Sequence, residues 1–244
     1  MTTPYIIGIG GFRRSGKDTL ARAIAAMAQS RGMATAIIAF ADPLRQAAAA
    51  AYGINAAEFT NDLLKDSVVE AWSITRRQML INLGEAMRGI DPDHWVKAWR
   101  RAVRRIPAQH YEPKASPWAG GTYHPTLIIT PDLRRVNEAQ VIHSLNGLNV
   151  LLRRDGVVWD GHLNEALAQV AQHRDDALAA QLGVHYAASN AMSIADSTSR
   201  RIVDCDVDNP VSRRQVEPAT EQQRRQLDSM AAAILDRAMQ GKKH

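Results

Sequence analysis

The most informative run of this 244-residue chain is Tyr5-Ile-Ile-Gly-Ile-Gly-Gly-Phe-Arg-Arg-Ser-Gly-Lys-Asp-Thr-Leu20. An apolar stretch over residues 5–9 predicts a buried strand, which breaks into glycine at Gly10 and Gly11. Gly16 and Lys17 follow, and an alanine-rich helical pattern begins after them. Strand, glycine loop and helix with the spacing G-x-x-x-x-G-K predict a phosphate-binding loop.

Each residue type in this loop has a physical reason. Glycines let the backbone wrap closely around a polyphosphate, so that several N–H groups point at it. The helix that starts near Gly16 adds the positive end of its dipole, and Lys17 reaches the outer phosphates as a mobile point charge. A chance glycine-rich turn is the alternative, and it is disfavoured because strand, loop, lysine and helix all occur in order.

The residue after Lys17 departs from the usual motif, in which Ser or Thr follows the lysine and binds magnesium. Asp18 occupies that position, and the hydroxyl comes one residue later, at Thr19. Kinases of small phosphorylated molecules often have this G-K-x-T form, whereas GTPases and motor ATPases usually keep the hydroxyl next to the lysine. The loop therefore favours a kinase.

Composition and charge are those of a globular protein that handles anions. Hydrophobic residues make up 45% of the chain and charged residues 23%, with a net charge of +5. This charge suits nucleotides and alone is weak evidence for nucleic-acid binding. The single cysteine, Cys205, excludes an internal disulfide and is expected to pack in an apolar run. With no signal peptide or membrane-spanning run, we expect a cytoplasmic location.

Strands that alternate with helices predict an α/β fold with a central parallel sheet of about five strands. Besides the first strand, strands are expected over 35–40, 126–130, 148–152 and 202–208. A helix is expected over 19–31, and a second begins at residue 41. A third runs from a cap at Ser73 or Thr75 to about residue 89. Further helices are expected over 91–105, 133–147, 162–182 and 220–239. Residues 54–72 read as a short polar helical region and 106–124 as an insertion loop.

Acidic residues follow two of the predicted strands. Residues 126–130 lead into Pro131 and Asp132, an arrangement that puts a carboxylate beside magnesium and phosphates. Asp42 lies where ligands of open α/β sheets bind, and it also starts a helix that it could cap, so both interpretations stay open.

Two other groups of residues have simple structural interpretations. Trp95 and Trp99 lie four residues apart on one helical face and are interpreted as core more readily than as base-stacking platforms. Four arginines crowd the end of the same helix and are interpreted as a solvated face that favours the negative helix terminus: Arg100, Arg101, Arg104 and Arg105. No His/Cys cluster has metal-ligand spacing, so we expect no structural zinc.

Several pieces of the chain form an ordered set between residues 5 and 156. They are Gly11-Phe-Arg-Arg-Ser-Gly-Lys-Asp-Thr19, Ala41-Asp-Pro-Leu44, Thr75-x-Arg77 before Leu83-Gly84, Asp93-His-Trp-Val96, Asp132-Leu-Arg-Arg135 with Glu138, and Arg153-Arg154. With these pieces the sequence resembles the phage-type deoxynucleoside monophosphate kinases, and more distantly the animal phosphomevalonate kinases of the same P-loop group. Glu85 replaces the Thr usual in phage members, and Gly84-Glu-Ala-Met-Arg88 looks more like the phosphomevalonate branch. Residues 106–124 and 162–182 match neither.

The resemblance implies one P-loop kinase domain, a three-layer sandwich over residues 1–244. It further implies an acceptor-binding helical region over about 42–105 and a lid or insertion over about 153–200. The reaction would transfer the γ-phosphoryl of ATP to the phosphate of a small monophosphate, with Mg²⁺ as cofactor. Such transfer needs two anions held in line and the developing charge neutralised, which suits a chain that offers arginines.

The same resemblance assigns roles to individual residues. The implied catalytic residues are Lys17, Arg14, Asp132, Arg134, Arg153 and Arg154. The implied ATP-binding residues are Gly11, Arg13, Arg14, Ser15, Gly16, Lys17, Asp18, Thr19 and Asn209, and the implied magnesium-binding residues are Asp18, Thr19 and Asp132. The implied acceptor-binding residues are Asp42, Arg45, Arg77, Trp95, Arg134 and Glu138.

Three functions stay open at this point. The first is a deoxynucleoside monophosphate kinase, and the second transfers the same group to phosphomevalonate or to a hydroxymethylated base in DNA. The third is a nucleotide-binding module without transferase activity, which would have no reason to keep the arginines of D-x-R-R. The expected partner is a small nucleotide; nucleic acid is not favoured, no membrane partner is expected, and a homodimer is compatible with the sequence.

Overall fold

The computed structural model describes residues 4–113, 121–154, 184–186, 192–194, 205–208 and 220–240. The chain divides into two compact units, of which the first joins Met1–Ile38 to Ile106–His244 and the second is Ala39–Arg105. The glycine loop, residues 10–17, belongs to the first unit, and the predicted helical region 42–105 falls within the second. The predicted helix over 162–182 and the predicted ATP contact at Asn209 lie outside the described residues.

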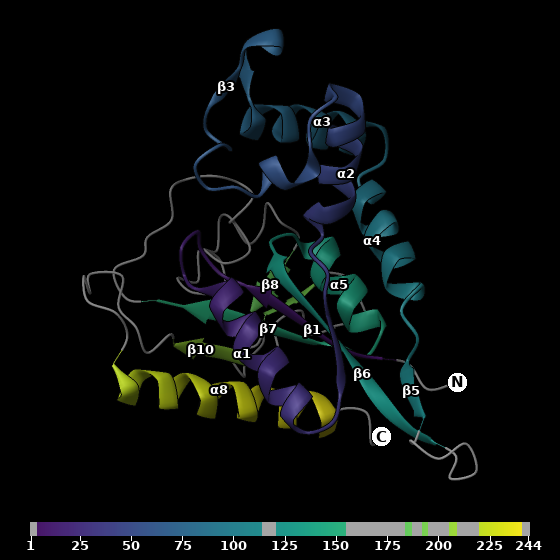
Figure 1. Cartoon of the computed structure of the whole chain (residues 1–244), viewed down its shortest axis with the longest axis vertical. Coiled ribbons are helices and arrows are strands. Elements are labelled where there is room, and N and C mark those ends of the chain that lie inside the picture. The colour runs from purple at the N-terminus through teal and green to yellow at the C-terminus, as the bar shows by residue number, and fades with distance from the viewer. Residues whose placement is uncertain are drawn as a thin grey trace. The chain divides into compact units, whose positions relative to one another are not determined.

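Five parallel strands form the central sheet of the first unit (Figure 1). Their order across the sheet is β10-β7-β1-β6-β2, with β1 at the centre. The bounds are β1 Tyr5–Gly10, β2 Ala34–Ile37, β6 Gly121–Leu133, β7 Leu148–Arg153 and β10 Cys205–Asp208. The central strands are apolar along their length because a parallel sheet is covered on both faces. The predicted α/β class with about five parallel strands is confirmed.

Helices cover both faces of this sheet, which makes three layers. On one face, Ile7 of β1 packs with Leu20 and Leu235 of two helices. On the other face, Ile142 of a third helix packs closely against Gly8 of β1. A Cβ added at Gly8 would lie only 2.4 Å from Cδ1 of Ile142. Successive residues of a strand point to opposite faces, so β1 serves both layers. The three helices are α1 Lys17–Ser30, α8 Glu221–Gln240 and α5 Val136–Ser144.

Residues 106–124 do not form the predicted loop. Residues Gln109–Pro113 form β5, which pairs antiparallel with the first part of β6. Tyr111 lies directly opposite Tyr123, with 5.1 Å between the ring centroids. Pairs of this kind stabilise a hairpin even where neither strand alternates polar and apolar residues. Strand β6 also continues to Leu133, so the helix predicted from 133 begins three residues later.

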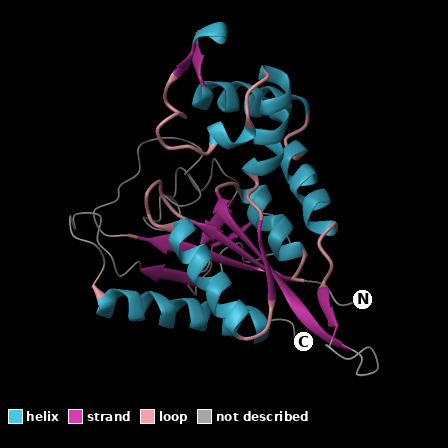
Figure 2. Cartoon of the chain, viewed as in Figure 1, coloured by secondary structure: helices cyan, strands magenta, loops and turns pink. Residues whose placement is uncertain are grey.

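The second unit consists mainly of helices joined by short elements (Figure 2). The elements are α2 Ala41–Tyr52, η1 Ala56–Phe59, β3 Val68–Val69, η2 Glu70–Trp72, β4 Ile74–Thr75, α3 Arg76–Ile90 and α4 His94–Arg104. Helix α3 begins as predicted, because the Oγ1 of Thr75 accepts from the N–H of Gln78 at 3.1 Å. Trp99 is fully buried and its ring lies 4.5 Å from that of Phe40, as its core interpretation predicted.

Two short strands, β8 Val184–Tyr186 and β9 Met192–Ile194, pair antiparallel. Among the helices of the described residues, none has the length and apolarity needed to cross a bilayer.

Candidate functional site

The glycine loop forms a tight turn between β1 and α1. Gly11 has a φ of +137°, and a Cβ there would lie only 2.3 Å from the carbonyl oxygen of Leu152. Gly16 has a φ of +98° and forms the N-cap of α1. Both conformations favour glycine strongly, so the loop has this shape because its sequence has glycine at these two positions.

Lys17 lies against the loop that it follows. Its Nζ donates to the carbonyl oxygens of Gly11 and Phe12, each at 2.7 Å. Asp18 and Thr19 are exposed on the first turn of α1. The first N–H groups of a helix have no partner within that helix and attract anions. A phosphate in the loop would meet these N–H groups and draw the flexible lysine away from the two carbonyls.

The sheet opens beside this loop, at the carboxyl ends of β1 and β6. Helix α1 follows β1 on one face and α5 follows β6 on the other, so the connections diverge there. Ligands of open α/β sheets bind at such points. Gly10 of β1 lies opposite Leu133 of β6, and the neighbours of Leu133 are Asp132 and Arg134. The structure thus places Asp132 and Arg134 on the strand end adjacent to the loop.

The register between β1 and β6 shifts at this point. Gly8 pairs with Thr130 and Gly10 with Leu133, so two steps along β1 correspond to three along β6. The extra residue falls at Pro131 or Asp132. An extra residue in one strand redirects the side chains beside it. This shift could not be predicted, since Pro131 alone also fits an ordinary strand end.

Glu138, predicted as an acceptor contact, lies buried in the first turn of α5. Its side chain is buried, with 5% exposure, and its Oε2 accepts from the N–H groups of Arg134 at 2.8 Å and Arg135 at 3.0 Å. This carboxylate caps α5 and fixes the backbone of the segment that carries Arg134. Burial, together with the nearby charge of Asp132, raises the pKa of Glu138 to about 7. Glu138 thus has a structural role, and its contact with the acceptor stays a prediction.

This pKa makes stability depend on pH. Between about pH 4.5 and 7 the folded chain keeps a proton on Glu138 that the unfolded chain loses, so stability falls as pH rises through this window. The loss is about 3 kcal/mol at 1.36 kcal/mol per pKa unit. Glu138→Gln keeps an oxygen that accepts from the backbone and cannot titrate. Urea unfolding at pH 5 and pH 8 should show the variant gaining stability relative to the native chain at the higher pH; a difference independent of pH would contradict the buried-carboxyl account.

The other side of the loop faces β7. Gly10 lies opposite Leu151, two residues before Arg153. Arg154 donates from Nη1 to the carbonyl oxygen of Arg14 at 2.9 Å. Arg14 itself has a left-handed backbone, with a φ of +64°, and its side chain is exposed, as is that of Arg13. The structure therefore brings the two predicted lid arginines to the strand end beside the loop and attaches one of them to the loop backbone.

The remaining predicted acceptor residues belong to the second unit. Asp42 accepts from the N–H of Ala39 at 2.8 Å and from Nη1 of Arg45 at 2.6 Å, so it stabilises the turn that enters α2. Trp95 is buried, and its Nε1 donates to the carbonyl oxygen of Gly84 at 3.1 Å. Both its ring and its N–H are used inside the unit, as the core interpretation predicted, and the substrate contact of Trp95 stays a prediction.

Arg77, in the first turn of α3, forms an ion pair that was not predicted from the sequence. Its Nε donates to Oδ1 of Asp66 at 2.5 Å, and its Nη2 donates to Oδ2 at 3.1 Å. This two-point contact raises the pKa of Arg77 above its ordinary value. The guanidinium of Arg77, which was expected to bind an acceptor phosphate, binds the carboxylate of Asp66 in this structure.

The donor set beside the loop fits a magnesium ion bound together with ATP. Magnesium usually keeps several waters and takes one or two carboxylates with substrate phosphates, so it needs no protein cage. Asp132, Asp18 and Thr19 supply oxygens of that kind. Within the described ranges, no group of three or more His, Cys, Asp or Glu residues could hold a metal by itself.

Comparisons with known proteins supply little beyond this geometry. No protein-family profile matches the chain, and no curated protein sequence matches it. Among solved structures, a gluconokinase from Sinorhizobium meliloti 1021 aligns with 97% of this chain and 94% of its own, at 16% identity and a TM-score of 0.35. A similarity this low carries no argument about substrate, so the fold assignment rests on the strand order and the loop described above.

Proposed function

We propose that the chain is an ATP-dependent kinase that transfers the γ-phosphoryl of ATP to the phosphate of a deoxynucleoside monophosphate, giving ADP and a deoxynucleoside diphosphate. The observation that supports it best is the adjacency of two strand ends. One carries the glycine loop with Lys17, and the next carries Asp132 and Arg134 on either side of Leu133, which pairs with Gly10. Phosphoryl transfer needs this kind of placement, since its catalysis is mostly positioning and charge neutralisation.

Each side chain beside the loop has a part in this proposal. The loop amides and Lys17 hold the β and γ phosphates, and Arg154 fixes the loop from β7 through the Arg14 carbonyl. Asp132, with Asp18 and Thr19, would hold magnesium, which when bound neutralises charge on the phosphates. Arg134 presents a guanidinium at the same sheet edge, and Glu138 keeps its backbone in place.

The acceptor's phosphate is the anion that Arg77 is proposed to bind. This phosphate is largely ionised at neutral pH, so the reaction needs no strong general base, and the chain offers arginines accordingly. An arginine can bind two phosphate oxygens at once, which fixes direction as well as distance. Arg45, which pairs with Asp42 at the start of α2, is a second proposed acceptor contact.

Arg77→Ala should raise the Michaelis constant for the acceptor by about tenfold to a hundredfold, the loss expected for hydrogen bonds to a charged group. The Michaelis constant for ATP should change little, because that nucleotide binds in the first unit. Steady-state kinetics with each substrate varied in turn measures both constants. An effect confined to ATP would contradict the acceptor role of Arg77.

A panel of acceptors tests the proposed substrate. ADP release from ATP should be measured with each of the four deoxynucleoside monophosphates, with phosphomevalonate, and with duplex DNA that contains a hydroxymethylated base. The proposal predicts acceptor-dependent release with at least one deoxynucleoside monophosphate. Faster release with phosphomevalonate or DNA would move the assignment to that acceptor, and ATP binding without acceptor-dependent release would favour a nucleotide-binding module.

A further inference from the structure

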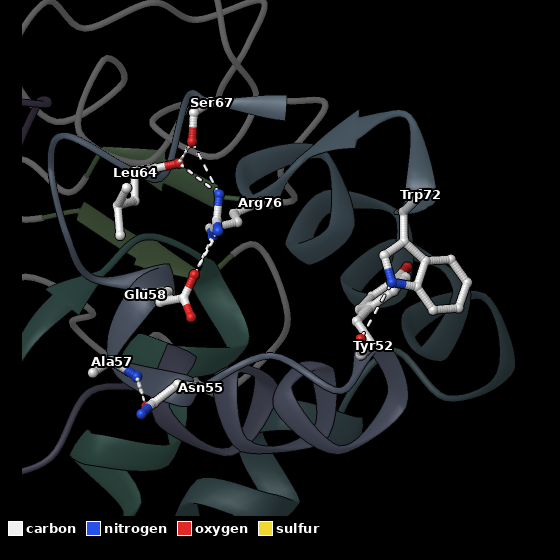
Figure 3. A network of polar contacts seen from close by, with 8 residues as sticks. All are labelled: Tyr52, Asn55, Ala57, Glu58, Leu64, Ser67, Trp72 and Arg76. Atoms are coloured by element: carbon white, nitrogen blue, oxygen red, sulfur yellow. Dashed lines mark hydrogen bonds and ion pairs between the residues drawn. The ribbon is translucent and has the colours of Figure 1, made fainter. Parts of the chain in front are cut away.

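Two consecutive arginines at the start of α3 hold the segment formed by residues 58–67. Arg76 donates from Nε to Oε2 of Glu58 at 2.9 Å and from Nη1 to Oγ of Ser67 at 2.9 Å (Figure 3). Its Nη2 makes a further contact with the same Glu58 oxygen. The side chain of Arg76 is 13% exposed. Water screens this partly buried pair less than an exposed one, so Arg76 holds the segment against α3.

Arg77 makes a similar contact in a very different environment. Its side chain is 38% exposed and that of its partner Asp66 is 56% exposed. Exposed ion pairs contribute only about 0–1 kcal/mol, because water solvates both partners when they separate. The backbone N–H of Arg77 also donates to the carbonyl oxygen of Lys65 at 2.8 Å, so the segment stays beside the helix whether or not the side chains are paired. The Arg77 side chain can therefore change partners while the backbone stays in place.

We propose that Asp66 is a competing carboxylate, which holds the guanidinium of Arg77 until the phosphate of the acceptor displaces it. This inference rests on the proposed function and adds a determinant of acceptor affinity to it. A carboxylate and a phosphate both present two oxygens that match the arginine fork, so one can replace the other without moving the arginine. The phosphate has the larger charge, so it displaces the carboxylate of Asp66 from the guanidinium of Arg77.

The competition determines how strongly an anion must be attracted to Arg77 in order to bind there. Any anion that binds Arg77 must first replace Asp66, and a singly charged carboxylate has no advantage over the one already present. A phosphate dianion has such an advantage. Asp66 thus lowers the affinity of Arg77 for every anion, and a phosphate dianion, which is attracted to the guanidinium most strongly, displaces it at the lowest concentration. The neighbouring Asp62, which pairs with Lys65, adds negative charge near Arg77 and weakens the binding of anions there further.

Asp66→Asn tests the competition directly. The variant should lower the Michaelis constant for the acceptor about twofold to fivefold, the range that corresponds to an exposed ion pair of up to about 1 kcal/mol. The turnover number and the Michaelis constant for ATP should stay unchanged, because Asp66 competes only in the enzyme without acceptor. An unchanged or raised Michaelis constant for the acceptor would overturn the inference. It would mean that Asp66 has no effect on acceptor binding or that it helps to orient Arg77.

Glu58→Gln is the matched control, because it weakens the neighbouring pair of Arg76 with Glu58 on the same segment. This variant should lower the melting temperature without lowering the Michaelis constant for the acceptor. If Glu58→Gln lowered that constant as much as Asp66→Asn, loosening of the segment would explain both results and the competition would be refuted.

A second measurement separates this inference from the kinase proposal. The Nε–H signal of Arg77, assigned by its loss in Arg77→Lys, can be followed by NMR in isotope-labelled protein while inorganic phosphate is added. The signal should shift at a lower phosphate concentration in Asp66→Asn than in the native chain. If no acceptor of the panel supports ADP release, the kinase proposal fails and this titration still tests the exchange; a signal that does not respond to phosphate in either protein overturns it.

Discussion

Lys17→Met is expected to lower kcat/KM for phosphoryl transfer by about 10²–10³-fold, the effect of removing one charge-stabilising group from a transition state. Lys17 lies against the glycine loop, and its Nζ donates to the backbone carbonyl oxygens of Gly11 and Phe12. Methionine has a similar length and no charge. The change therefore removes the attraction to the β and γ phosphates with little change in packing.

Two comparisons make the Lys17 result specific. Lys97→Met removes an exposed lysine of α4 that pairs with Asp91, and it should leave the rate of transfer unchanged. Circular dichroism and thermal melting of the Lys17 variant should match those of the native chain. Full activity in a folded Lys17→Met protein would refute the phosphate role of the loop.

Gly11→Ala should destabilise the fold by about 3 kcal/mol and abolish measurable ATP binding, which is the largest effect we expect from a single methyl group. Two costs add at this position. The φ of +137° is strained for alanine, and the new Cβ would collide with the carbonyl oxygen of Leu152 at 2.3 Å. This oxygen belongs to the backbone of β7, so it cannot swing aside as a side chain would. The loop must move, and its N–H groups then no longer converge on one phosphate.

Gly53→Ala is the control for Gly11→Ala, because it introduces backbone strain without a collision. Gly53 also has a positive φ, +66°, but nothing lies within 4 Å of a Cβ there. Its replacement should cost only about 1 kcal/mol, the strain of alanine in a left-handed conformation. Urea unfolding measures both variants, and calorimetry with ATP measures binding. Equal losses of stability at the two glycines would contradict the close approach of the loop to β7.

Much of the fold could be predicted because its signals are local. The run at residues 5–9, the glycines after it and the cap at Thr75 each depend on neighbours in sequence. The hairpin of β5 with β6 could not be predicted, because its stability comes from cross-strand pairs such as Tyr111 with Tyr123. Periodicity along one strand does not contain that information.

The candidate site shows the same division between local and distant signals. The spacing of Lys17 and its glycines specified the loop, and the apolar strand before Asp132 specified the neighbouring acid. The structural role of Glu138 was missed because a capping box is normally recognised by Ser or Thr at the N-cap, and this helix has Arg135 there. The pairing of Arg77 with Asp66 joins residues eleven positions apart across a loop, so no short motif contains it.

Transfer of label from γ-labelled ATP to a mixture of the four deoxynucleoside monophosphates, with native and Lys17→Met proteins compared side by side, tests the central claim most directly. The native protein should produce a labelled deoxynucleoside diphosphate in the presence of Mg²⁺, and the Lys17→Met protein should produce almost none. Label that stays in ATP, or that appears only as inorganic phosphate with the native protein, would contradict the account.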